Sequence, residues 1–195
     1  RDVGVRRVVL VSSGAIYGDQ AEQPLRETMP PNPHSPYAVS KLAAEYYVNT
    51  IGDLWNIETV CLRVFNAYGP GQHLPASHPP VVPYFLRQAI RNGSLVVHGD
   101  GSQTRDYVYV DDVVSGLIAA STAPNLDGLV INIGSGKETS VRELVKNVLE
   151  VTGSKAEAIF NPKTTGGVSR MCTDLTLAAA KLGYRPSIPL SHGLR

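Results

Sequence analysis

The sequence predicts an α/β fold built on a parallel β-sheet. Residues 7–11 form a continuous run of β-branched and aliphatic residues, the pattern of a strand buried on both faces of such a sheet. A second apolar run covers residues 57–64. Between the two runs, Ser35 fits an N-cap and Pro36 the first position of a helix that extends to about residue 50. Strand, helix and strand in this order form a βαβ unit with a right-handed crossover.

The rest of the chain continues the alternation of strands and helices. A loop at 68–83, dense in Pro, Gly and His, has the length and composition of a functional loop. Asp111-Asp112 is predicted to cap a helix, and Ser140-Val-Arg-Glu143 has the spacing of a capping box. The later predicted elements are a helix at 82–92, a strand at 95–98, a turn at 99–101, a strand at 105–110, a helix to 122, a strand at 129–133, a helix after 140, a strand near 156–160, a helix at 174–182 and the beginning of a helix at 189–195.

Composition and charge exclude several classes of function. The 195 residues have a net charge of +1 and no basic run, so we expect neither nucleic acid nor an anionic membrane as a partner. No apolar stretch approaches the roughly 20 residues of a membrane span, and the sequence shows no signal peptide. Cys61 and Cys172 lie far apart and are predicted to be reduced thiols, which favours a cytoplasmic location. The five histidines lack metal-ligand spacing, so no metal site is predicted.

The pair Tyr37 and Lys41 is the main candidate for chemistry. Residues four apart share a helix face, so both side chains can project into one site. A free tyrosine ionises near pH 10, and forming a phenolate at neutral pH therefore costs about 4 kcal/mol. A fixed cation nearby offsets much of that cost. The spacing thus predicts a general base, with a solvated helix face as the alternative.

Four motifs, in the same order, resemble those of the extended short-chain dehydrogenase/reductase family, and especially its nucleotide-sugar epimerases and dehydratases. They are Val11-Ser-Ser-Gly-Ala-Ile-Tyr-Gly18; Leu62-Arg-Val-Phe-Asn66 followed by Tyr68-Gly-Pro70; Gly99-Asp-Gly-Ser-Gln-Thr-Arg-Asp-Tyr-Val-Tyr-Val-Asp-Asp112; and Gly183-Tyr-Arg-Pro186. Together with Tyr-x-x-x-Lys they extend over nearly the whole chain. The resemblance is closest to the epimerases that act on UDP-sugars.

The resemblance implies the C-terminal part of a doubly wound, Rossmann-type parallel sheet, together with a small α/β substrate-binding domain. On that basis residues 1–68 and 104–135 belong to the NAD-binding domain, and residues 69–103 and 136–195 to the substrate domain. The family's Gly-x-x-Gly-x-x-Gly turn, which holds the cofactor pyrophosphate at a helix N-terminus, does not occur in this sequence. We therefore expect the chain to be an N-terminally truncated enzyme without turnover of its own.

The resemblance also implies roles for individual residues. Tyr37 is expected to act as the base, Lys41 to hold the cofactor ribose, and Ser13 to bond the reacting oxygen, with NAD as cofactor. The expected cofactor-binding residues are Ser12, Tyr37, Lys41 and Phe65. The expected substrate-binding residues are Ser13, Asn66, Val82, Leu95, Val97, Arg105 and Arg170. For Arg105 the alternative is a structural ion pair with Asp106 or Asp111, and for Val82, Leu95 and Val97 it is core packing. The alternatives for the others are a serine that ends a strand for Ser13, a core aromatic for Phe65 and a surface arginine for Arg170.

One departure from the family concerns phosphate binding, and the two residues after Ser13 bear on the type of reaction. Many relatives carry an Arg-Pro-Gly-Asp segment whose Arg binds phosphate; here Thr164-Thr-Gly-Gly167 stands in its place, and Arg170 is the candidate substitute. Dehydrating and decarboxylating relatives carry acidic or polar residues after the catalytic Ser/Thr, where this chain has Gly14 and Ala15. We therefore expect a 4-epimerase of the UDP-glucose type that forms a homodimer when complete. The alternatives are a UDP-glucuronate decarboxylase, a 4,6-dehydratase, or a non-catalytic sugar-nucleotide-binding regulator.

Overall fold

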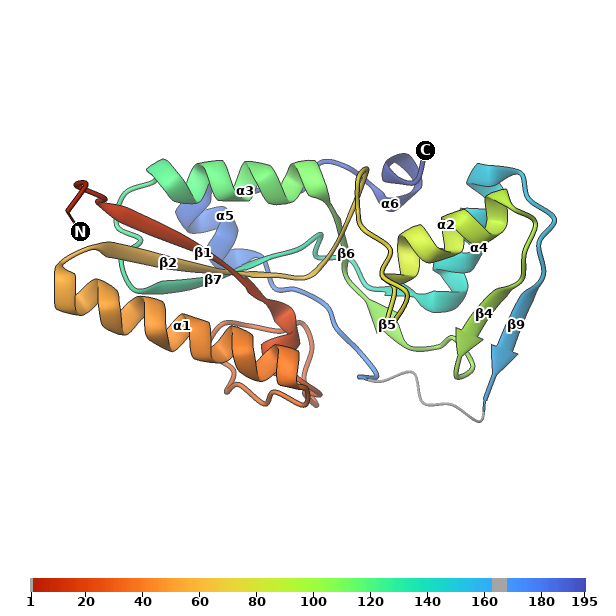
Figure 1. Ribbon diagram of the computed structural model, residues 1–195, viewed down its shortest axis with the longest axis horizontal. Coiled ribbons are helices and arrows are strands. Elements are labelled where there is room, and N and C mark those ends of the chain that lie inside the picture. Colours follow the sequence, from red (N-terminus) through yellow and green to blue (C-terminus); the bar gives the residue numbers. More distant parts are fainter. Residues whose placement is uncertain (1, 163–167) are drawn as a thin grey trace.

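The computed structural model describes residues 2–162 and 168–195, which form two lobes (Figure 1). The first lobe contains a parallel sheet in the order β1-β2-β7. Helix α1 covers one face of this sheet, and α3 and α5 cover the other (Figure 1). The bounds are β1 Arg7–Ser13, α1 Pro36–Trp55, β2 Glu58–Val64, α3 Val110–Thr122, β7 Leu129–Ile133 and α5 Thr176–Leu182. The predicted α/β fold with a parallel sheet is confirmed.

Helix α1 begins where the sequence predicts. The Ser35 side chain accepts a hydrogen bond from the backbone N–H of Ala38 at 3.1 Å, and Pro36 follows at the first helical position. The helix continues beyond the predicted end and stops at Asn56, which adopts a left-handed conformation. Near that end Gly52 lies against β2, and a Cβ there would come within 2.4 Å of Thr59 Cγ2. The close approach fixes how α1 rests on the sheet.

Strand β1 differs from its prediction. We expected a strand buried on both faces, but Val8 and Val11 are 37% and 42% exposed. Within the described residues β1 pairs only with β2, so it forms an edge of the sheet. An aliphatic run reports how apolar a strand is, and not how many neighbours cover it.

The segment around Asp106 and the start of α3 also differ from expectation. The strand predicted at 105–110 is divided at Asp106 into β5 (Thr104–Arg105) and β6 (Tyr107–Tyr109). Strand β5 pairs antiparallel with β8 (Thr139–Ser140), and β6 pairs parallel with β3 (Asn66–Tyr68). The predicted Asp111-Asp112 cap is wrong, because α3 has Tyr109 as its N-cap without a side-chain hydrogen bond. The Asp112 carboxylate instead accepts hydrogen bonds from Ser187 and Ile188.

The second lobe packs two helices against a short parallel pair of strands. Its elements are α2 (Val81–Ile90), β4 (Leu95–His98), α4 (Val141–Thr152) and β9 (Ala158–Asn161). The Ser140 hydroxyl accepts from the N–H of Glu143 at 3.1 Å, so one half of the predicted capping box is formed. Its buried core includes Phe85, Leu95, Leu144 and Val148.

Residues from the far end of the chain return to the first lobe. After Thr176, Ala178 and Tyr184 pack into the same buried cluster as the residues of β2 and β7. A short helix, α6 (Leu190–Gly193), follows and contacts β6. The division into 1–68 with 104–135 and 69–103 with 136–195 stays a prediction. Across the described residues, no helix has both the length and the apolar character needed to cross a membrane.

Candidate active site

A cavity of about 460 Å³ opens where β1 and β2 end, and most of the predicted site residues line it. Parallel strands bring their carboxyl ends to one edge, which is why residues far apart in the sequence meet there. The predicted residues that line this cavity are Ser12, Ser13, Tyr37, Lys41, Phe65, Asn66 and Val82. The site therefore joins the end of β1, the first turns of α1 and the segment after β2.

Ser13 lies at the point where β1 turns into a 3₁₀ helix, η1 (Gly14–Tyr17). Its hydroxyl oxygen accepts a hydrogen bond from the N–H of Ala15 at 3.2 Å, which leaves the hydroxyl proton free to bond a ligand. Gly14 rests on the ring of Phe65, because a Cβ on Gly14 would come within 2.9 Å of two ring carbons. Ala15 also lines the cavity.

Tyr37 and Lys41 share one face of α1, as their spacing predicts. The Lys41 ammonium donates to the carbonyl oxygen of Val11 at 2.9 Å and lies 5.8 Å from the centroid of the Tyr37 ring. Tyr37 is 56% exposed and borders the cavity. The contact to Val11 anchors the ammonium at the end of β1, on the side of the helix that carries Tyr37.

Ser12 borders the same cavity but points its hydroxyl into the protein. It donates to Glu45 at 2.5 Å, and both residues are buried. A hydroxyl has one proton, so Ser12 can offer a ligand only an acceptor. The cofactor role predicted for Ser12 is limited in this way.

A second cavity, of about 860 Å³, adjoins the first through Asn66, Val81 and Tyr107. Val97 and Arg105 line it, together with Tyr84, Phe85 and Gln103. Leu95 is fully buried in the core between α2 and α4 and lines neither cavity. The three residues predicted to line a base pocket are therefore divided between the first cavity, the second cavity and the core.

Arg105 is held by backbone oxygens at the edge of the second cavity. Its Nη1 donates to the carbonyls of Thr104 and Val168, each at 2.7 Å. Burial lowers the pKa of Arg105 from its ordinary value. The neighbouring Asp106 carboxylate accepts hydrogen bonds from Ser135, Gly136 and Thr173.

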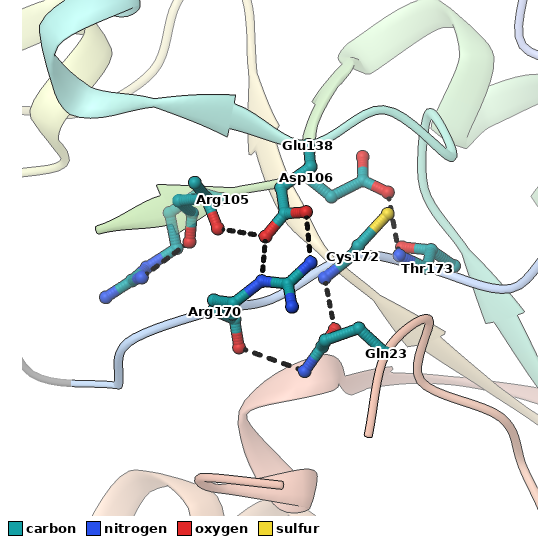
Figure 2. A network of polar contacts seen from close by, with 8 residues as sticks. Gln23, Arg105, Asp106, Glu138, Arg170, Cys172 and Thr173 are labelled. Atoms are coloured by element: carbon teal, nitrogen blue, oxygen red, sulfur yellow. Dashed lines mark hydrogen bonds and ion pairs between the residues drawn. The ribbon is translucent and has the colours of Figure 1, made fainter. Parts of the chain in front are cut away.

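Arg170 is bound by a carboxylate outside both cavities. Its Nε and Nη2 each donate to Glu138 at 2.7 Å, and the Thr104 hydroxyl also bonds Glu138 (Figure 2). Figure 2 also shows the Gln23 amide bridging the carbonyl of Arg170 and the N–H of Cys172. In this arrangement Arg170 lies apart from the cavity of Tyr37. The segment 164–167, which replaces the Arg-Pro-Gly-Asp of many relatives, lies outside the described residues.

The Arg170–Glu138 pair predicts a measurable titration. The hydrogen bonds from Arg170 lower the pKa of Glu138 to about 2. A lowered carboxyl pKa stabilises the fold above the unfolded pKa near 4.5, and the contribution disappears as the pH falls toward about 2. We expect a carbon-detected NMR titration to place Glu138 near 2. The Arg170→Ala variant should move it back toward 4.5, and a midpoint that does not move would contradict the pairing.

Sequence reasoning assigned no role to three polar residues of the first cavity. Among the described residues, the hydroxyls of Tyr68 and Tyr107 and the Gln72 Oε1 atom are buried and have no hydrogen-bond partner. All three residues line the cavity. Buried polar groups are normally paired, so the three unpaired atoms set these residues apart. The Tyr68 hydroxyl lies beside Gly193 of α6, where a Cβ would come within 2.4 Å of it. Tyr68 and Tyr107 lie within two of the motifs shared with the family, and that position was the feature of the sequence that could have pointed to them.

The described residues contain no cluster of His, Cys, Asp or Glu that could hold a metal ion.

Comparison with known proteins identifies the family. The family model described as "NAD dependent epimerase/dehydratase family" matches residues 1–134. The chain belongs to the NAD-dependent epimerase/dehydratase family. The description of the family names NAD as its cofactor, and the Rossmann-type fold predicted from the sequence is confirmed.

Relatives within the family resemble the chain over all or nearly all of its length. It is 39% identical to a UDP-glucose 4-epimerase of Mycolicibacterium smegmatis, over 100% of this chain and 62% of that protein. A Thermotoga maritima UDP-glucose 4-epimerase with UDP-glucose superposes with a TM-score of 0.92 at 37% identity, over 99% of this chain and 62% of that one. A Thermus thermophilus UDP-glucose 4-epimerase in complex with NAD superposes with a TM-score of 0.88 at 32% identity, over 100% of this chain and 63% of that one. The chain thus spans less than two thirds of these relatives.

Proposed function

We propose that this chain forms the catalytic and substrate-binding part of an NAD-dependent nucleotide-sugar 4-epimerase of the UDP-glucose/UDP-galactose type. The observation that carries the proposal is the cavity that Ser13, Tyr37 and Lys41 line together, with an alanine, Ala15, as the lining residue that follows Ser13. The reaction would pass through a 4-keto sugar. NAD, when bound, supplies a reversible hydride acceptor.

The three residues have separate tasks in this mechanism. The Tyr37 oxygen would take the proton of the sugar hydroxyl as the hydrogen on the same carbon leaves as hydride. It would return that proton to the same oxygen when the hydride re-enters on the opposite face of the keto carbon. Lys41, held by the Val11 carbonyl at 2.9 Å, keeps its positive charge 5.8 Å from the centroid of the Tyr37 ring and offers its remaining protons to a ribose hydroxyl. Ser13 donates its free hydroxyl proton to the reacting oxygen. The residues present fit the nicotinamide ribose end of NAD, because Tyr37 and Lys41 lie at the cavity rim with Phe65 inside it.

The surroundings of Ser13 support epimerisation over elimination or decarboxylation. Ala15 lines the cavity but cannot transfer a proton. Gly14 is covered by the Phe65 ring, so that ring would have to move before a side chain could stand at position 14. A decarboxylase or a 4,6-dehydratase gains from an acid or base at these positions. Those two activities remain the alternatives.

The substrate roles follow the division between the cavities. Asn66 borders both, and we propose that it contacts the diphosphate, with Arg105 beside it in the second cavity. Val82 and Val97 would contact the base. Leu95 would support this region from the core. For Arg170 to reach a phosphate, the substrate would have to displace Glu138.

A product assay tests the proposal. The complete protein that carries this chain should convert UDP-glucose into UDP-galactose with NAD, and proton NMR distinguishes the two sugars. A stable 4-keto-6-deoxy product from a nucleotide sugar, or loss of CO₂ from UDP-glucuronate, would support one of the alternatives. Binding of UDP-sugars without any product would support a non-catalytic regulator.

The 195-residue chain by itself is expected to lack turnover. The sequence has no glycine-rich dinucleotide turn, which in a Rossmann fold holds the pyrophosphate at a helix N-terminus. We expect no UDP-galactose from this chain and no NAD bound in a 1:1 ratio, as measured by equilibrium dialysis. Stoichiometric NAD binding to the purified chain would contradict this expectation.

We also propose that the complete protein forms a homodimer through α1. Tyr46, Tyr47, Leu54 and Trp55 are exposed along this helix. Exposed apolar residues concentrated on one element are typical of association surfaces. Light scattering of the complete protein would test the dimer.

The cytoplasmic location stays a prediction, supported by Cys61 and Cys172, which are both free thiols.

A further inference from the structure

A buried ion pair lies beneath the candidate site, on the same helix face as Tyr37 and Lys41. Glu45 is one turn beyond Lys41 and pairs with Arg63 of β2 through two bonds, from Nε at 3.0 Å and Nη2 at 2.8 Å. The two residues are only 3% and 4% exposed. Glu45 also accepts the Ser12 hydroxyl at 2.5 Å.

These contacts pin α1 to the end of β1 at consecutive residues. Lys41 bonds the carbonyl of Val11, and Glu45 bonds the side chain of Ser12. Successive side chains of a strand point to opposite faces. Ser12 is thereby held toward α1, and the next residue, Ser13, lines the cavity.

The pair extends across the sheet. The Arg63 guanidinium lies 4.7 Å from the centroid of the Tyr17 ring, and the Tyr17 hydroxyl donates to Asn132 Oδ1 at 2.8 Å. Tyr17 belongs to η1, which follows Ser13 directly, and Asn132 belongs to β7. One polar chain therefore joins α1, β1, β2, η1 and β7 below the cavity.

A buried ion pair is a weak source of stability, since apolar residues of similar volume often replace it without loss. Its directional bonds, however, fix geometry. We propose that Glu45, through Ser12 and Arg63, is a positioning residue that sets the separation between Ser13 on the strand and Tyr37 and Lys41 on the helix. This inference rests on the proposed function.

The decisive variant is the apolar double substitution Glu45→Leu with Arg63→Met in the complete protein. We expect the variant to stay folded, because apolar residues replace the buried charges, with a melting temperature lowered mainly by the Ser12 hydroxyl, which loses its acceptor. We also expect kcat for UDP-glucose to fall by about 10- to 100-fold, because small misplacements of catalytic groups cost that much, with KM nearly unchanged. Wild-type kcat in this variant would overturn the proposal. The assay is repeated at temperatures well below the melting temperature; if kcat then returned to the wild-type value, the loss would come from unfolding, and the proposal would be overturned as well.

A matched control exists at the other end of the same two strands. Arg7 and Glu58 form an ion pair at 2.6 Å between β1 and β2, far from the cavity. The double variant Arg7→Met with Glu58→Leu should keep the wild-type kcat, and an equal loss of kcat there would show a general effect of strand pairing and overturn the proposal.

A second measurement separates this inference from the proposed function. Hydrogen exchange of the α1 amides at residues 38–45 should be faster in the Glu45/Arg63 variant than in the Arg7/Glu58 variant, whether or not UDP-glucose is turned over. Unchanged exchange would overturn the positioning role. Failure of the proposed function is recognised separately, by the absence of UDP-galactose from the wild-type complete protein.

Discussion

Replacing Tyr37 with phenylalanine is expected to lower kcat by about 10²–10⁴-fold in the complete protein, the range for loss of a general acid–base group. The substitution removes one oxygen and keeps the ring at the cavity rim. Lys41 would keep its hydrogen bond to Val11, because that contact does not involve the phenol. KM for UDP-glucose should therefore change little, since the proposed substrate contacts at Asn66 and Arg105 remain. Initial rates with UDP-glucose and NAD would measure both constants.

Tyr46 provides the control for this experiment. It lies on the same helix, is more exposed than Tyr37, and does not line the cavity. Tyr46→Phe keeps the ring that the proposed dimer surface would use and removes only a hydroxyl away from the cavity, so kcat should stay within about twofold of the wild type. If Tyr37→Phe behaved like Tyr46→Phe, the assignment of Tyr37 as the base would be wrong, and a non-catalytic role for the cavity would gain support.

The features predicted well from the sequence are those set by local contacts. The start of α1 depends on Ser35 and Pro36, which act within one turn, and the structure shows that cap. Strand β7 has the predicted bounds because its apolar run ends at a glycine. Tyr37 and Lys41 share a face because four residues advance a helix by about one turn.

The features that were missed depend on partners distant in the chain. The sequence of residues 7–11 predicted a strand correctly. The exposure of these residues was not predictable, because it depends on how many strands flank β1. Asp112 has the local signature of a cap, yet it bonds Ser187, 75 residues away. Arg63 alternates with apolar residues in β2 and gave no sign that Glu45 would meet it. Burial of a polar side chain becomes visible only once its partner is placed.

Asp106 illustrates the same dependence and predicts a large loss of stability. Its carboxylate is fully buried, and it accepts bonds from the N–H and hydroxyl of Ser135 and from the N–H groups of Gly136 and Thr173. Figure 2 shows how it ties the segment of Thr173 to the end of β5. Four donors converge on two oxygens, so a neutral amide of the same shape cannot satisfy them all.

We therefore expect Asp106→Asn to lower the free energy of unfolding by about 2–3 kcal/mol. If the amide oxygen faces Gly136 and Thr173, the Ser135 hydroxyl can rotate to accept from the amide nitrogen, but the Ser135 N–H loses its partner. Urea unfolding monitored by circular dichroism would measure the change. Asp111→Asn is the control, because Asp111 is exposed in the first turn of α3 and should contribute at most about 1 kcal/mol through the helix dipole. Equal losses in the two variants would show that the Asp106 carboxylate does not organise these segments.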